Sequence, residues 1–313
     1  MYFIGELRDQ VKGQEIVEEL RAKGIEAEIK YIAKEDMWAI FVAMEVHVPM
    51  AQEFYRVKLG LKKPFEIEKE WVEIKSLPNG FMTMTILVVC LILYLLSYAA
   101  IGDQLYEFLM FSEIKEPRMF HSILNGEWWR VITPIFLHMN ILHILFNMLW
   151  FKDLGNVIEY NFSVRFYLLF VLFVGLTSNL LQYIVQGPSF GGMSGVLYGM
   201  LGFLWVFKRA HANFSFGIPD RDMTIMLVWF VLCLTGFLGP IANLAHAGGL
   251  SAGMFLALGV ERSTMTMSKK QQFVIFLAAV FILLATLVIE GFKLEGQYYI
   301  LKNLAASAAE VVI

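Results

Sequence analysis

A serine flanked by glycines and a distant histidine are the residues of this sequence that could act as a nucleophile and its base. Ser194 lies in the run Gly-Gly-Met-Ser-Gly at residues 191–195, and His246 lies in Ala-His-Ala-Gly-Gly at residues 245–249. Small neighbours let a substrate approach the hydroxyl closely, and a neutral imidazole beside it can accept its proton. Taken alone, such a serine more often hydrogen-bonds to its own helix.

The surroundings of Ser194 and His246 favour a dyad over a triad. If Ser194 begins a helix, free backbone N–H groups and the positive end of the helix dipole can stabilise an oxyanion. The GxSxG pattern of α/β-hydrolases is not matched, because Val196 takes the last position. No aspartate or glutamate occurs between residues 240 and 260, so no acid nearby in sequence completes a triad.

A second polar group lies earlier in the chain, at His138, His143 and Asn147. His143 and Asn147 are four residues apart and therefore share a helix face, and we place His138 near one end of the same helix. Polar side chains inside a membrane usually face the bundle interior or a water-filled cavity, where these could donate to an oxyanion. Hydrogen bonding between helices is the alternative. A metal site is disfavoured, because no carboxylate completes a ligand set and HExxH is absent.

Stripes of small residues would bring the serine and the histidine together. Glycines recur at helical spacing after each of them: Gly195, Gly199 and Gly202 in one segment, and Gly249 and Gly253 in the other. Such faces allow two helices to pack closely in lipid. Their first turns would then be neighbours.

The composition indicates that the elements carrying these residues cross a lipid bilayer. Of 313 residues, 58% are hydrophobic and 17% are charged, against about 25% charged in soluble proteins. The net charge of −3 favours no nucleic-acid partner. We predict seven membrane helices, at about 82–101, 131–151, 166–184, 194–208, 223–239, 244–260 and 273–291.

The chain changes character at about residue 78. Before it, the pattern predicts strands at Tyr2–Leu7, Ile25–Ile32 and Met37–Met44 and helices at Gln10–Lys23 and Val48–Leu59. This order is most of a ferredoxin-like α+β unit, whose fourth strand could be Phe65–Ile67 or Trp71–Ile74. We predict a small domain over 1–78, a catalytic membrane domain over 79–261, and a linker, seventh helix and tail over 262–313. The small domain could regulate, dimerise or bind a partner.

The distribution of Lys and Arg predicts a cytoplasmic N-terminus and a C-terminal tail on the opposite side. Seven basic residues then fall in cytoplasmic loops, and three fall on the other side before the last helix: Lys115, Arg118 and Arg130. The long loop at about 102–130 ends in Trp128-Trp129-Arg130. Tryptophan and arginine are typical of a membrane interface, and the loop's amphipathic content favours a half-submerged element.

Four stretches together resemble the rhomboid family of intramembrane serine proteases, over about residues 82–260. They are Trp129-Arg130, His138-x4-His143-x3-Asn147, Gly192-Met193-Ser194-Gly195 and Ala245-His246-x2-Gly249-x3-Gly253. The resemblance is closest to bacterial members with a small cytoplasmic N-terminal domain. It implies a six-helix bundle, to which this chain adds a C-terminal helix, in the bacterial inner membrane.

The resemblance also implies roles for residues. Ser194 would be the nucleophile and His246 the base, with His143, Asn147 and the Ser194 N–H forming the oxyanion hole. Tyr198 would stack on the histidine, and Glu159 would help to hold the bundle together. The segment at about 223–243 would gate lateral entry of single-pass membrane proteins, which are cut near the outer end of their membrane segment. No cofactor or metal is implied.

Two other classes of function compete with a protease. A rhomboid-like binding protein without catalysis usually lacks the serine or the histidine, and this chain has both. A transporter using buried histidines for proton relay would place charged residues within its helices, and the interiors of the predicted spans contain almost none.

Overall fold

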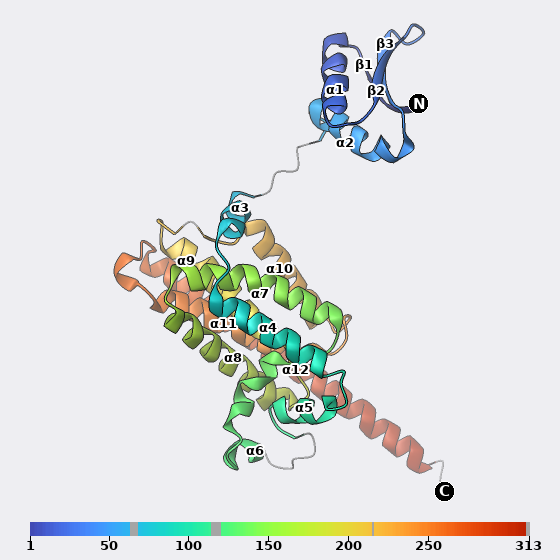
Figure 1. The fold of residues 1–313 in the computed structure, drawn as a ribbon. Helices are drawn as coiled ribbons and strands as arrows, with labels where there is room; N and C mark the ends of the chain where they lie inside the picture. Colours follow the sequence, from blue (N-terminus) through green and yellow to red (C-terminus); the bar gives the residue numbers. More distant parts are fainter. Residues whose placement is uncertain (63–67, 114–119, 215, 311–313) are drawn as a thin grey trace. The chain divides into compact units, whose positions relative to one another are not determined.

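The computed structural model describes residues 1–62, 68–113, 120–214 and 216–310, with side chains described as far as residue 294. Contacts divide the chain into two compact units, Met1–Ile67 and Glu68–Ile313 (Figure 1). We expected the change at about residue 78, whereas residues 68–76 make their contacts within the second unit.

The first unit is a three-stranded antiparallel sheet with two helices, in strand order β1-β3-β2. Its elements are β1 (Tyr2–Leu7), α1 (Gln10–Ala22), β2 (Ala27–Ile32), β3 (Met37–Val42), a 3-10 turn at Glu45–His47 and α2 (Val48–Lys58). Asp9 caps α1 by accepting from the Lys12 N–H at 3.1 Å. All five predicted elements are confirmed, with boundaries within two residues.

The predicted fourth strand is not found among the described residues. Trp71–Ile74, one of its two candidates, is helical, because it lies within α3 (Lys69–Ser76). The other candidate, Phe65–Ile67, lies outside the described residues. The ferredoxin-like arrangement therefore stays a prediction.

The second unit is helical. Its helices are α3, α4 (Phe81–Leu96), α5 (Gly102–Leu109), α6 (His121–Leu124), α7 (Ile141–Asn161), α8 (Val164–Gln186), α9 (Ser194–Ala210), α10 (Asp220–Leu234), α11 (Asn243–Gly259) and α12 (Lys269–Glu310), with 3-10 turns at Trp128–Val131, Thr133–Phe136 and Arg262–Thr264. The long helices form a bundle, and α5 and α6 gather at the end remote from α3 (Figure 1).

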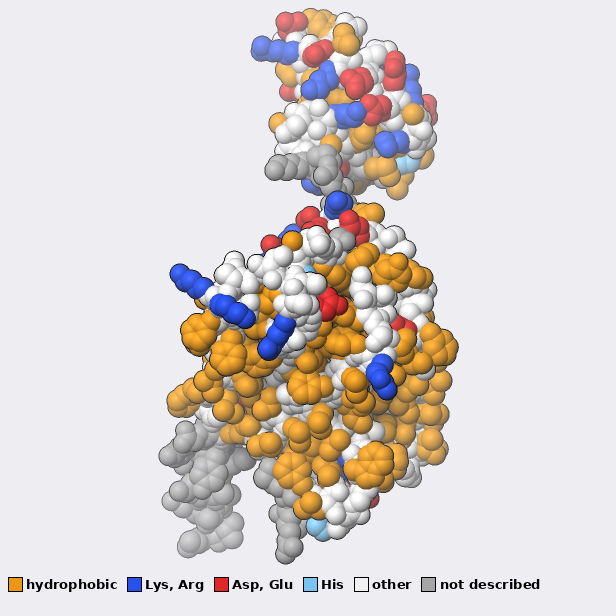
Figure 2. Space-filling view, turned by 90° about the vertical axis from the view of Figure 1, so that its left-hand side faces the viewer, with side chains coloured by type: hydrophobic (Ala, Val, Ile, Leu, Met, Phe, Trp, Pro, Cys, Tyr) orange, Lys and Arg blue, Asp and Glu red, His pale blue; other side chains and the backbone are white. Residues whose placement is uncertain are grey.

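The surface of the second unit is that of a helical membrane protein. Large apolar side chains are exposed along α4, α7, α8, α10 and α12, for example Ile92, Phe146, Leu169, Val228 and Phe281. Figure 2 shows hydrophobic side chains covering most of the visible face of this unit. Such a surface is stable in lipid and would aggregate in water.

Among the described residues, two helices are by themselves long and apolar enough to cross a membrane: α8, and α12 over Lys269–Leu294. A third candidate arises if α3 and α4, bent by 88° at their junction, form one span. Helices α9 and α11, with 17 residues each, are shorter than the roughly 20 residues of a typical span. Both are mostly buried among other helices.

The predicted second membrane helix, 131–151, is wrong by ten residues at each end, because α7 covers Ile141–Asn161. The apolar run before it contains Pro134 and forms short 3-10 turns. Asn140 caps the true helix start by accepting from the His143 N–H at 2.9 Å. His138 therefore lies in the loop before α7 and not at the end of the helix.

Glu159, near the end of α7, holds the start of α4. Its carboxylate accepts from the backbone N–H groups of Met82 at 2.9 Å and Thr83 at 2.7 Å, and from the Thr83 hydroxyl at 2.7 Å. An anion at a helix N-terminus pairs with free N–H groups and with the helix dipole. This contact fixes α4 against α7.

Candidate active site

Ser194 and His246 lie in hydrogen-bond contact. Ser194 is the first residue of α9, and His246 lies in the first turn of α11. The Ser194 Oγ and the His246 Nε2 are 2.7 Å apart. The imidazole is buried, with 6% of its surface exposed, whereas Ser194 is half-buried. Ser194 is therefore only partly covered, and its hydroxyl contacts the buried ring.

Glycines let α9 and α11 approach until their backbones touch, as the stripes predicted. A Cβ atom on Gly249 would lie 1.9 Å from the carbonyl oxygen of Gly195, and one on Gly253 would lie 1.9 Å from that of Gly199. Any side chain at these positions would force the helices apart. The two first turns, and with them the serine and the histidine, are set side by side by this packing.

Aromatic rings hold the imidazole in place. The ring of Tyr198, one turn after Ser194, lies 4.6 Å from that of His246 at an interplanar angle of 34°. The Tyr198 hydroxyl donates to the carbonyl of Met226 in α10 at 3.3 Å, and Phe230 contacts both rings. Among the described residues, the His246 Nδ1 has no hydrogen-bond partner. The Nε2 atom is thus the one aimed at Ser194.

The ring of His143, in the first turn of α7, lies against Gly192, two residues before Ser194. The start of α7 therefore lies at the same end of the bundle as the serine. A Cβ on Gly192 would lie 2.7 Å from the His143 Nε2, and Gly192 has a φ of +124°, which L side chains rarely adopt. His138, in the preceding loop, is buried, and its ring lies 5.1 Å from that of His143. The Asn147 amide donates to the carbonyl of His143 at 2.7 Å, so in this state it bonds to its own helix.

Trp129 and Arg130 fasten the segment that carries α5. The Arg130 guanidinium is buried, pairs with Glu127, and donates to the carbonyl of Met110 at 3.0 Å. Trp129 donates to the carbonyl of Phe108 at 3.3 Å. The charge of Arg130 is therefore satisfied inside the loop. Trp128 alone of the three is largely exposed.

The sequence analysis missed a polar stripe on α8. Ser178, Gln182 and Gln186 recur at intervals of four residues and so share one helix face. Ser178 lies against Gly195, and the Gln182 Oε1 accepts from the N–H groups of Leu244 and Ala245 at 3.1 and 3.2 Å. This spacing of polar residues in an apolar helix was the signal that could have revealed them.

Comparison with known proteins identifies relatives of this arrangement. The profile of the family described as "Rhomboid domain" matches residues 125–263. The rhomboid protease GlpG of Haemophilus influenzae is 31% identical over 182 residues, covering 56% of this chain and 88% of the relative. That of Yersinia pseudotuberculosis is 29% identical over 186 residues, covering 59% of this chain but only 64% of the relative.

Proposed function

Since the chain belongs to the rhomboid family, we propose that it is an intramembrane serine endopeptidase that cleaves single-pass membrane proteins. The observation that carries the proposal is the 2.7 Å contact between the Ser194 Oγ and the His246 Nε2. A hydroxyl and an imidazole at this distance are the arrangement of an activated nucleophile.

In the proposed reaction, the Ser194 oxygen attacks the scissile carbonyl while its proton passes to the His246 Nε2. The protonated imidazole then gives that proton to the leaving amine, and the C–N bond breaks. Water, activated by the same nitrogen, hydrolyses the acyl-enzyme and frees Ser194. The unpaired Nδ1 of His246 supports a dyad, in which ring stacking on Tyr198 takes the orienting role of an acid.

An oxyanion would form at the end of the bundle where α7 and α9 begin. We propose that the Ser194 N–H, His143 and Asn147 donate to it. The approach of Gly192 to the His143 ring supports a place for His143 in this pocket. The Asn147 amide donates one N–H to the His143 carbonyl, and its second N–H is the one that we propose for the oxyanion.

We further propose that the catalytic end lies on the outer side, with the N-terminus cytoplasmic and the tail after α12 outside. The excess of Lys and Arg in the loops assigned to the cytoplasm supports this orientation. Substrates would enter past α10, whose Met226 and Phe230 contact Tyr198. Unwound backbone is costly in lipid, so segments with helix-destabilising residues would be favoured.

The proposal is tested by labelling purified protein in detergent with a fluorophosphonate probe and by following cleavage of a reporter transmembrane substrate. The wild type should label and cleave, whereas Ser194→Ala and His246→Ala should do neither while keeping the wild-type melting temperature. Full activity in Ser194→Ala would remove the nucleophile, and full activity in His246→Ala would remove the dyad. Wild type that neither labels nor cleaves would favour a binding protein.

A further inference from the structure

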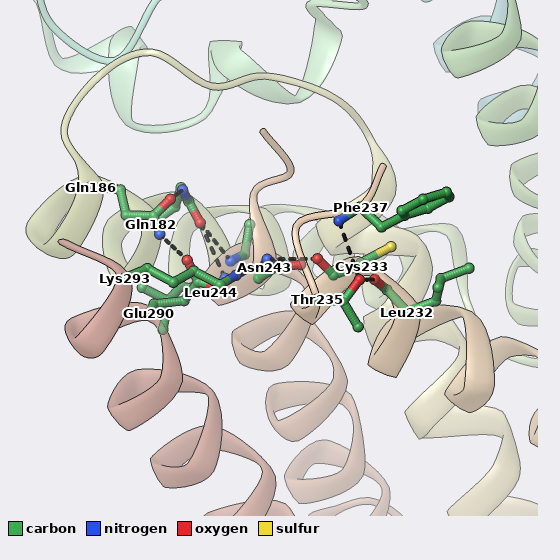
Figure 3. Close-up of polar contacts among 11 residues, drawn as sticks. Gln182, Gln186, Leu232, Cys233, Thr235, Phe237, Asn243, Leu244, Glu290 and Lys293 are labelled. Carbon is green, nitrogen blue, oxygen red and sulfur yellow. Dashed lines mark hydrogen bonds and ion pairs between the residues drawn. The ribbon is translucent and has the colours of Figure 1, made fainter. Parts of the chain in front are cut away.

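Glu290 is a buried carboxylate within the apolar helix α12, with 2% of its surface exposed. A charged side chain at such a place is costly unless it is paired, and in membrane helices it usually serves a function. Glu290 accepts from the Asn243 Nδ2 at 2.9 Å, from Gln186 and from Lys293 (Figure 3). Its partners come from α8, α11 and α12 itself.

Asn243 joins the carboxylate to the helix that carries the histidine. It is the first residue of α11, three residues before His246. Its Nδ2 donates both to Glu290 and to the carbonyl of Cys233 at 3.3 Å, near the end of α10. Both partners are acceptors, which fixes the orientation of the amide. The ends of α10, α11 and α12 therefore meet at one side chain.

A second path runs from Glu290 through α8. Gln186 donates to the Glu290 carboxylate, and its Oε1 accepts from the Gln182 Nε2 at 2.8 Å. Gln182 in turn accepts the N–H groups of Leu244 and Ala245. Ala245 directly precedes His246. Two hydrogen-bonded paths from one carboxylate thus converge on the first turn of α11.

We propose that Glu290 is a positioning residue of the active site, which makes the seventh membrane helix part of the catalytic scaffold. The inference rests on the proposed protease function. The carboxylate offers one oxygen to Asn243 and the other to Gln186. An apolar replacement therefore leaves one N–H of the buried Asn243 and one N–H of the half-buried Gln186 without their acceptor. The first turn of α11 then loses the anchor that holds His246 against Ser194.

The test compares Glu290→Leu, Glu290→Gln and a matched control, Ser251→Ala. The control removes another hydrogen bond between α11 and α12, from the Ser251 hydroxyl to the carbonyl of Ala279 at 2.9 Å. Glu290→Leu should lower the rate of fluorophosphonate labelling and kcat about tenfold or more, since small displacements of a catalytic group are costly, and leave KM unchanged. Glu290→Gln keeps an acceptor for Asn243 but turns an amide donor toward Gln186, so it should restore only part of the rate. Ser251→Ala should keep the wild-type kcat.

The outcomes separate this inference from the proposed function. Wild type without labelling or cleavage would contradict the protease itself. Active wild type together with wild-type kcat in folded Glu290→Leu, or with an equal loss of kcat in Ser251→Ala, would overturn the role of Glu290 alone. If Glu290→Leu does not fold, Gln186→Met is the variant that tests the inference, since it breaks the path through Gln182 and leaves Asn243 paired. A reduced labelling rate in Gln186→Met supports the inference, and a wild-type rate refutes it.

Discussion

Replacing Gly249 by alanine tests whether the contact between α9 and α11 sets the catalytic geometry. The new Cβ would lie 1.9 Å from the carbonyl oxygen of Gly195, a distance that real Cβ atoms do not reach. That oxygen belongs to the backbone, so no side chain can rotate to relieve the clash. The helices must separate by roughly 1.5 Å before the Cβ reaches ordinary van der Waals contact, which begins at 3.4 Å.

The magnitude follows from the position of the clash, one turn after His246 and one residue after Ser194. A separation of roughly 1.5 Å would stretch the contact between the Ser194 Oγ and the His246 Nε2, now 2.7 Å, beyond the length of a hydrogen bond. A misplacement of that size costs about a hundredfold in rate. Overpacking of the interface should also cost about 1–3 kcal/mol of stability.

The assay measures the rate of fluorophosphonate labelling and the melting temperature in detergent, side by side. The matched control is Gly259→Ala, at the other end of α11, where a Cβ would meet nothing within 4 Å. It should keep the wild-type labelling rate. Gly253→Ala, whose Cβ would lie 1.9 Å from the carbonyl oxygen of Gly199, should cost similar stability but less activity, because the clash is farther from the site.

Labelling of folded Gly249→Ala at the wild-type rate would refute the reasoning, because the dyad would then tolerate wider spacing of the two helices. Equal activity losses in Gly249→Ala and Gly253→Ala, in proportion to their melting temperatures, would also count against it. Such a result would assign the glycines to stability and not to positioning.

Three further predictions concern groups around the site and at its support. Glu159→Leu leaves three donors at the start of α4 without their acceptor. It should lower the free energy of unfolding, measured by denaturant titration in detergent, by about 2 kcal/mol, whereas little change would mean that water replaces the carboxylate. Gly192→Ala combines a positive φ with a clash against His143 and should lower kcat at least about tenfold with a smaller effect on KM; unchanged kcat would remove His143 from the oxyanion pocket. The Lys208 ammonium, 2.9 Å from Glu70, holds the pKa of that carboxyl below its usual 4.5. The ion pair therefore stabilises the fold above that pH, and its contribution is lost as the pH falls through the lowered pKa. The stability advantage of wild type over Glu70→Gln, about 0.5 kcal/mol, should vanish in melting curves taken in strong acid. A stability difference that persists there would show that the charge is not its source.

The proximity of Ser194 and His246 could be predicted from sequence because the packing that creates it is local. Glycines at helical spacing mark the contact face of each helix, and each stripe begins next to the residue that does chemistry. Two helices that each carry such a small-residue face can pack closely against each other.

Other features of the structure could not be predicted from the sequence, each for a physical reason. Hydropathy reports whether residues prefer lipid and not whether they are helical, so the apolar turns around Pro134 were assigned to α7. The burial of Arg130 could not be seen in the sequence, because the backbone carbonyl to which it donates belongs to Met110, about twenty residues away. Glu290 was a visible signal, a lone acid in an apolar run, but its partners lie on helices far apart in sequence.

The burial of α9 constrains how this protein is made. This helix has 17 residues, of which all but four are buried inside the described part of the bundle, so it gains little from entering the bilayer alone. Its closest partner, α11, emerges from the ribosome only after α10 has been synthesised. A nascent chain that stops before Asn243 would hold α9 without that partner and would be a target for quality-control proteolysis. We therefore expect α9 to settle in the bundle only once α11 has been made.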